Sequence, residues 1–136
     1  MSPQELKFIN PANLYDPTSN GYTHIVIAPA RSVTVYIAGQ GGEDKNGNLP
    51  NDFVTQLKQA FENLKRALAA AGAAPEQVVK IGTFIVDHDE QKLAQLTSEI
   101  VTIWGQRSPA QTLVPVPRLA LDGMLFEVEA IAVLPE

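Results

Sequence analysis

Residues 124–133 constrain the fold of this chain more than any other stretch. Glu127 and Glu129 are two residues apart, so on a β-strand their side chains point to the same face. The opposite face is wholly apolar, and the first face also carries apolar residues. This mixture predicts that the two acids lie at a partly covered place, such as a pocket or a subunit seam. The acids share their face with Leu125, Ile131 and Val133, while Met124, Phe126, Val128, Ala130 and Ala132 form the other.

The composition is typical of a globular protein. A length of 136 residues fits one domain over residues 1–136, and 45% hydrophobic with 18% charged residues argues against disorder. Because the chain has no cysteine, disulfides, thiolate metal sites and a cysteine nucleophile are excluded. A net charge of -5 argues against binding to nucleic acid, which usually requires a basic surface.

The beginning of the chain, residues 1–5, lacks the basic and apolar blocks of a signal peptide. No apolar run approaches the roughly 20 residues that span a bilayer. We therefore expect a cytoplasmic protein that does not enter a membrane.

The first part of the chain reads as short strands separated by loops. Residues 5–9 are compatible with a short strand, and residues 10–21 form a loop rich in Pro, Asn, Gly and Asp. Residues 23–28 and 32–38 are rich in β-branched residues, and the turn Pro29-Ala30-Arg31 between them predicts a hairpin.

Two amphipathic helices follow. Apolar residues recur every three or four positions over residues 53–71, with Asn51 or Asp52 as the N-cap, and again up to Trp104, with Asp87 or Asp89 as the N-cap. Together with strands at 79–86, 112–116 and 124–134, the order is ββαβαββ. Two long helices beside a sheet predict a two-layer α+β domain.

Two segments of this chain resemble a known family. Pro109, Ala110 and Thr112, followed by Glu127-Val128-Glu129-Ala130-Ile131-Ala132, resemble the C-terminal signature of the Rid family (YjgF-like, reactive intermediate deaminases, also labelled endoribonuclease L-PSP). The resemblance extends over nearly the whole chain and includes residues 37–40, 69–72 and 79–87. It implies a fold like chorismate mutase of the bacillus type and a homotrimer with a cleft at each subunit seam. Surplus apolar strand surface independently predicts a second covered face.

The resemblance also assigns candidate residues to that cleft. It implies that Glu127 orients or deprotonates a water, while Glu129 is structural; two solvated acids on a half-exposed strand are the alternative. It further implies substrate contacts from Tyr22 and from the backbone near Gly39, Gln40 and Val114. A carboxylate among apolar neighbours has a raised pKa, which suits a base that works near neutrality.

One position departs from the family pattern. Gln111 stands where the Pro-Ala-Arg motif has its arginine, which in family deaminases binds the substrate carboxylate through two charge-assisted hydrogen bonds. An amide can donate a hydrogen bond but carries no charge, so the usual 2-iminopropionate-type substrate is not expected. Arg107 and Arg118 are the candidates for replacing the missing arginine, and a surface position is the alternative for each.

These residues lead to two hypotheses for function. The first is hydrolysis of a small imine or enamine to a carbonyl compound and ammonia, without a cofactor or metal. The second is a non-catalytic, small-molecule-binding or chaperone-like trimer that uses the same cleft, so the sequence leaves open whether the protein is an enzyme. Two observations argue against a ribonuclease. The net charge is negative, and the only histidines, His24 and His88, are not spaced as a catalytic pair.

Overall fold

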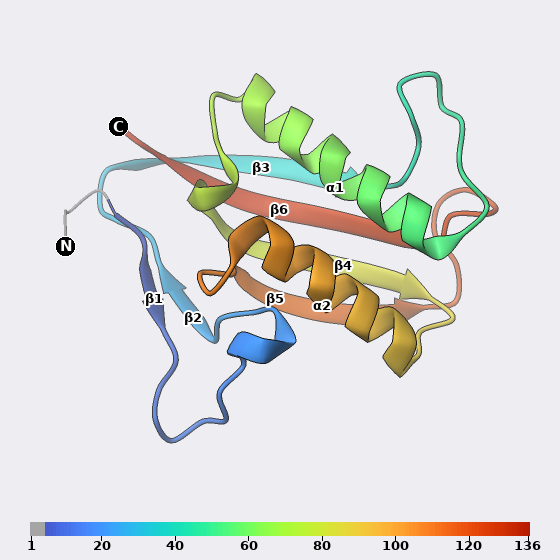
Figure 1. The fold of residues 1–136 in the computed structure, drawn as a ribbon. Helices are drawn as coiled ribbons and strands as arrows, with labels where there is room; N and C mark the ends of the chain where they lie inside the picture. Colours follow the sequence, from blue (N-terminus) through green and yellow to red (C-terminus); the bar gives the residue numbers. More distant parts are fainter. Residues whose placement is uncertain (1–4) are drawn as a thin grey trace.

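The computed structural model describes residues 5–136 and has a two-layer α+β arrangement, as the sequence predicts (Figure 1). The element order contains the predicted ββαβαββ series. The short strand expected within residues 5–9 and one 3-10 helix precede this series, and a second 3-10 helix lies within it. In chain order the elements are β1 (Lys7–Ile9), η1 (Thr18–Asn20), β2 (Ile25–Ile27), β3 (Ser32–Gln40), α1 (Phe53–Ala70), η2 (Pro75–Gln77), β4 (Val78–Val86), α2 (Glu90–Trp104), β5 (Ala110–Val116) and β6 (Phe126–Pro135).

The main sheet has four strands in the order β3-β6-β4-β5. β6 pairs antiparallel with both β3 and β4, whereas β4 and β5 are parallel and are connected through α2. The final strand of the chain therefore lies in the interior of the sheet. This central position explains why its apolar face is continuous over so many residues.

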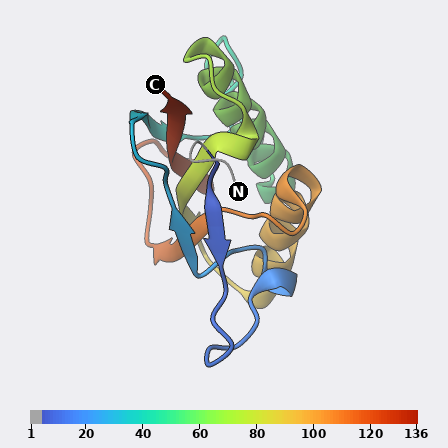
Figure 2. The same ribbon diagram turned by 90° about the vertical axis from the view of Figure 1, so that its left-hand side faces the viewer.

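Both long helices cover the same face of the sheet, and Figure 2 shows them together on one side of it. Each begins at an aspartate whose side chain accepts a hydrogen bond from the helix backbone. Asp52 accepts from the Thr55 amide at 3.0 Å, and Asp89 accepts from the Lys92 amide at 2.8 Å. Of the two alternatives at each helix start, Asp52 and Asp89 are thus the caps.

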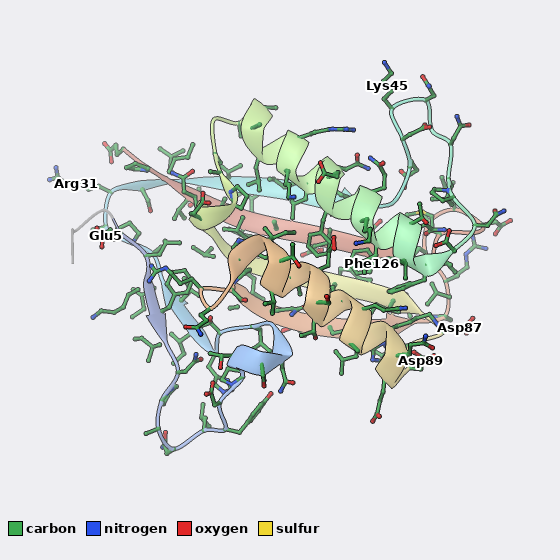
Figure 3. The ribbon with its side chains drawn as sticks, in the orientation of Figure 1. Glu5, Arg31, Lys45, Asp87, Asp89 and Phe126 are labelled. Atoms are coloured by element: carbon green, nitrogen blue, oxygen red, sulfur yellow. The ribbon has the colours of Figure 1, made fainter. Side chains whose placement is uncertain are left out.

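The core lies between the helices and the sheet. Phe126 is fully buried there, and Figure 3 shows it beneath the helix layer. Its ring centroid is 6.0 Å from that of Phe53 and 5.7 Å from that of Phe61, so β6 contacts α1 through aromatic packing. The other buried apolar residues of this layer include Leu57, Leu64, Leu68, Ile81, Ile85, Leu96, Ile100 and Val128.

The predicted hairpin of residues 23–28 and 32–38 is wrong. β2 pairs antiparallel with β1 in a separate two-stranded sheet, while β3 pairs with β6. The connection passes through Arg31 with a backbone φ of 58°, a left-handed conformation that redirects the chain between the two sheets. Strand propensity alone does not identify a strand's partner.

Among residues 5–136, no element covers the face of the main sheet opposite the helices (Figure 2). It exposes large apolar side chains, of which Tyr36 on β3 is 78% exposed. This surface is called the open face below. Among residues 5–136, no helix is both long and apolar enough to cross a membrane.

Candidate functional site

Glu127 lies on the open face, at a place made for it by a glycine. β6 and β3 are neighbours, and the Glu127 side chain fills the space that a Cβ atom on Gly39 would occupy. Partial burial raises the pKa of the Glu127 carboxyl above its ordinary value of 4.5, and repulsion from Glu43 and then Glu129 raises it further. A carboxyl group with a raised pKa is suited to accept and return a proton near neutral pH.

Glu129 lies on the same face of β6 as Glu127 but next to β4 instead of β3. It pairs with Gly82 of β4, and its Cγ atom would be 3.1 Å from a Cβ atom on that glycine. Glu129 is exposed, whereas Glu127 is partly buried. Burial therefore distinguishes the two acids of the same strand face.

A third acid approaches from the loop after β3. One carboxylate oxygen of Glu43 is buried and occupies the space that a side chain at Gly41 would need, and no donor within residues 5–136 reaches it. The loop backbone is held by Asn63 of α1, whose amide donates to the carbonyls of Gly41 at 2.9 Å and Glu43 at 2.8 Å. Glu43 is therefore placed by backbone hydrogen bonds rather than by an ion pair of its carboxylate.

Gln56 of α1 joins this loop to the start of β6. It is fully buried, and its amide nitrogen donates to the carbonyls of Pro50 at 2.7 Å and Gly123 at 2.9 Å. Its amide oxygen accepts a hydrogen bond from the Leu125 amide at 2.8 Å. Because Leu125 directly precedes β6, Gln56 also fixes the approach to Glu127.

A cavity of about 340 Å³ lies on the opposite, helix-covered side, at the β5 edge of the sheet. Beside it, Gly21 follows η1 with a left-handed φ of 79° and packs against Thr97 of α2. This turn presents Tyr22, whose ring packs edge-on against the rings of Tyr15 and His24. The residues that line the cavity are Tyr15, Asn20, Tyr22, Leu93, Leu96, Thr97, Gln111 and Leu113.

Gln111 forms a wall of this cavity and is tied to two other elements. Its amide oxygen accepts a hydrogen bond from the Thr83 hydroxyl at 3.0 Å, and its amide nitrogen donates to the Gly21 carbonyl at 3.4 Å. Thr83 is fully buried on the helix side of β4. One amide hydrogen of Gln111 remains for a ligand.

One chain does not bring all the predicted residues together. Tyr22 and Gln111 line the helix-side cavity, whereas Glu127 lies on the open face. Val114 is also on the open face, in a row with Phe84 and Glu127 across β5, β4 and β6. Gln40, in contrast, lines a separate hollow against α1, and its amide donates to the Ala38 carbonyl.

Neither arginine proposed as a replacement reaches Gln111. The Arg107 guanidinium lies over the ring of Phe8, 4.3 Å from the centroid, and lines a different hollow beside Trp104. Arg118 forms an ion pair with Asp122, with 3.1 Å between Nη2 and Oδ1. Both side chains are thus engaged away from the cavity.

Sequence reasoning missed several residues of these two groups. Tyr15 and Leu113 line the cavity, and Glu43 lies close enough to Glu127 to affect its pKa. Leu113 was predictable, because it is two residues from Gln111 and must share its strand face. Glu43 lies in the loop between β3 and α1, and the sequence does not predict the path of that loop. Within residues 5–136, no three His, Cys, Asp or Glu side chains gather as a metal site would require.

The chain is similar to proteins with known sequences and structures. Residues 15–134 match the family model of endoribonuclease L-PSP. A RutC family protein of Pyrococcus horikoshii is 35% identical over 100 residues, which are 72% of this chain and 77% of that protein. The 2-iminobutanoate/2-iminopropanoate deaminase of Escherichia coli K12 is 34% identical over 90 residues, which are 65% of this chain and 70% of that enzyme.

Solved structures agree with the sequence comparisons. The Rid protein YyfB of Yersinia pestis, described as a protein of unknown function, superposes with a TM-score of 0.90 at 34% identity, covering 96% of this chain and 99% of YyfB. TdcF of Escherichia coli with bound serine superposes with a TM-score of 0.66 at 27% identity, covering 86% of this chain and 95% of TdcF. The chain therefore belongs to the Rid family, the family of endoribonuclease L-PSP and YjgF-like proteins.

Proposed function

We propose that this protein hydrolyses a small imine or enamine to a carbonyl compound and ammonia, with Glu127 as the general base. The observation that carries the proposal is the position of Glu127, which is partly buried over Gly39 and has a raised pKa. The 34% identical relative from Escherichia coli is named a 2-iminobutanoate/2-iminopropanoate deaminase, which supports this class of reaction.

The proposed site is shared between two copies of the chain. The open face exposes the apolar parts of Tyr36 and Val114, a surface suited to burial against another copy. A homotrimer, as the family resemblance implies, would bring the open face of one copy to the helix-side cavity of its neighbour. Glu127 would then meet the partner subunit's cavity, which a single chain keeps on the other side of its sheet.

The proposed chemistry needs only a water and one carboxyl group. The water oxygen bonds to the imine carbon, the C=N electron pair moves to nitrogen, and Glu127 takes the proton that the water loses. Glu127 then protonates the nitrogen, accepts the hydroxyl proton as the C=O bond forms, and returns a proton to the departing ammonia. Because the imine carbon is already electrophilic, the reaction requires no cofactor.

The substrate is proposed to differ from 2-iminopropionate and its close relatives. Gln111 offers at most one neutral N–H to the cavity, whereas an arginine offers a charged, two-pronged donor. Losing such a charged hydrogen bond costs about 1.5–3 kcal/mol of binding, or roughly tenfold to a hundredfold in affinity. Neither Arg107 nor Arg118 compensates, since both are engaged elsewhere.

The same observation favours a second candidate function. A cavity without a cation to hold a carboxylate is also compatible with a protein that binds a small molecule and does not hydrolyse it. The two functions differ in whether Glu127 is needed for turnover or only for binding. An assay of turnover therefore decides between them.

The experiment is a competition between hydrolysis and trapping. An oxidase generates an imine in the presence of semicarbazide, which captures it as a semicarbazone, and added protein lowers the rate of capture if it hydrolyses the imine first. We expect this protein to lower semicarbazone formation for at least one imine of a panel that includes imines with and without a carboxylate. If no imine of the panel is protected from trapping, the hydrolase proposal is wrong and the binding function is favoured.

A further inference from the structure

The proposed site has two halves, the helix-side cavity of one copy and the open face of its neighbour, and the charges of each indicate which substrate fits. All eight residues that line the helix-side cavity are uncharged. Three of these side chains, Leu93, Leu96 and Leu113, are aliphatic, and two are tyrosines. Such a cavity accommodates an apolar body and gives no counter-ion to a carboxylate.

The half of the site on the open face carries negative charge. Glu127 lies over Gly39, and Glu129 follows on the same strand face. Glu43 lies against Gly41 at the end of β3, close enough to Glu127 to repel its carboxylate. The buried oxygen of Glu43 accepts no hydrogen bond from the part of the chain that the structure describes. A buried acceptor without a partner gains most from a ligand that donates a charge-assisted hydrogen bond.

The nearby cations do not cancel this charge. Lys80 is on the open face, but its amine donates to the Thr112 hydroxyl at 3.1 Å, and it is four residues along β4 from Phe84, the partner of Glu127. Four strand residues span about 13 Å. Lys45 and Arg66 line the hollow against α1, which Glu43 also lines, but neither forms an ion pair with Glu43 within the described residues.

We infer that the substrate is a protonated imine without a carboxylate, R–CH=NH₂⁺, in which R is an aliphatic group. This inference rests on the proposed function and names the substrate class of the same site. The aliphatic group would lie in the neutral cavity of one copy, and the iminium nitrogen would face Glu127 and Glu43 of the neighbouring copy. The tyrosine rings of the cavity add a surface that attracts cations through their π-electrons.

The reaction balances with water as the only co-reactant. R–CH=NH₂⁺ and H₂O give R–CHO and NH₄⁺, so the positive charge of the substrate leaves on ammonium. A new C=O bond replaces the C=N bond, and no oxidant or reductant takes part. A reaction that oxidises a primary amine would supply such an imine.

The test uses two imines that differ only in a carboxylate. A flavin-dependent amine oxidase converts 3-methylbutylamine to 3-methylbutan-1-imine, and an amino-acid oxidase converts leucine to 4-methyl-2-iminopentanoate. Protection from semicarbazide trapping is then measured for each. We expect the wild-type protein to protect the carboxylate-free imine at least about tenfold better, the effect of one charged hydrogen bond.

Two variants probe the two halves of the site separately. Gln111→Arg should reverse the preference by raising protection of the 2-imino acid about tenfold or more. Glu43→Gln should lower protection of the carboxylate-free imine and leave that of the 2-imino acid unchanged or improved. Glu62→Gln, the same charge change at an exposed position of α1, should leave both rates unchanged. Melting temperatures show whether each variant is folded.

A binding measurement separates the inference from the proposed hydrolysis. Calorimetry with 3-methylbutylamine and 4-methylpentanoate compares a cation and an anion that share a branched alkyl chain, and the cation should bind more tightly. If neither imine is hydrolysed but the cation binds preferentially, the hydrolase proposal fails and the ligand class stands. A wild-type preference for the 2-imino acid, or equal binding of anion and cation, would overturn the inference.

Discussion

The Glu127 carboxylate occupies the space that a side chain at Gly39 would need. The two residues come from neighbouring strands that are far apart in the sequence, and only a glycine lets the carboxyl group lie down against the β3 backbone. Gly82 of β4 has a looser version of this relationship with Glu129, whose Cγ atom would be 3.1 Å from a Cβ atom on that glycine. A substitution at either glycine would therefore displace the neighbouring carboxylate without changing the acidic residue itself.

Gly39→Ala should therefore impair imine hydrolysis while the fold is retained. The added methyl group displaces the flexible end of Glu127, and a catalytic group misplaced by about 1 Å can lose about a hundredfold in rate. Gly82→Ala is the matched control, since its methyl group contacts Glu129 instead. Turnover is compared at equal melting temperature, and equal losses in both variants would argue against a special role for Glu127.

Gln56→Ala should destabilise the protein strongly. The change leaves the Leu125 amide and the carbonyls of Pro50 and Gly123 without their buried partner. Unsatisfied buried groups cost about 1–3 kcal/mol each, so we expect a loss of about 2–5 kcal/mol in the free energy of unfolding. Urea denaturation measures it. Gln91→Ala, at an exposed position of α2, is the control and should change stability by less than about 0.5 kcal/mol.

Tyr36→Glu should dissociate the assembly. Tyr36 is 78% exposed in the single chain, so a charge at this position is harmless to a monomer and costly in a buried seam. Sedimentation equilibrium should give a trimer for the wild-type protein and a monomer for the variant. Val101→Glu changes an exposed apolar residue of the helix layer and should remain trimeric. A monomeric wild-type protein would contradict the proposed shared site.

Glu127 should also make stability depend on pH. Its pKa is raised in the folded state, so the folded protein retains the proton that the unfolded chain releases near the ordinary value of 4.5. The stabilisation is complete below that value and is lost as the pH rises through the folded-state pKa. The stability gained by Glu127→Gln relative to wild type should thus increase from low pH to neutral pH in urea titrations. A difference that is constant with pH would show that the pKa is not raised.

Local sequence patterns predicted most of the fold. The spacing of Phe53, Leu57, Phe61, Leu64 and Leu68 predicted α1, and the alternation in β6 correctly separated its buried face from the face of the acids. These patterns succeed because side chains return to the same face of a helix or a strand every few residues, so the pattern is visible within a short segment. The hairpin was wrong because strand pairing depends on contacts that are distant in the sequence, such as β3 with β6.

The candidate site was predictable only residue by residue. A family motif placed Glu127 and Gln111, but the sequence does not tell that they lie on opposite sides of one sheet. Likewise, Arg107 follows α2 closely enough to suggest a contact with Gln111, yet its guanidinium packs over Phe8. The competing aromatic partner comes from β1, about a hundred positions earlier, so spacing within the loop could not reveal it.

The proposed role of Glu127 is to take a proton from the attacking water. Turnover of an imine that the wild-type protein hydrolyses is measured for Glu127→Gln and Glu129→Gln at equal oligomer content. General-base assistance is worth about 10²–10⁴-fold, so Glu127→Gln should lose about that factor, while Glu129→Gln should lose much less. Retention of more than about half of the activity by Glu127→Gln would contradict the account, because such a loss is far below any general-base contribution.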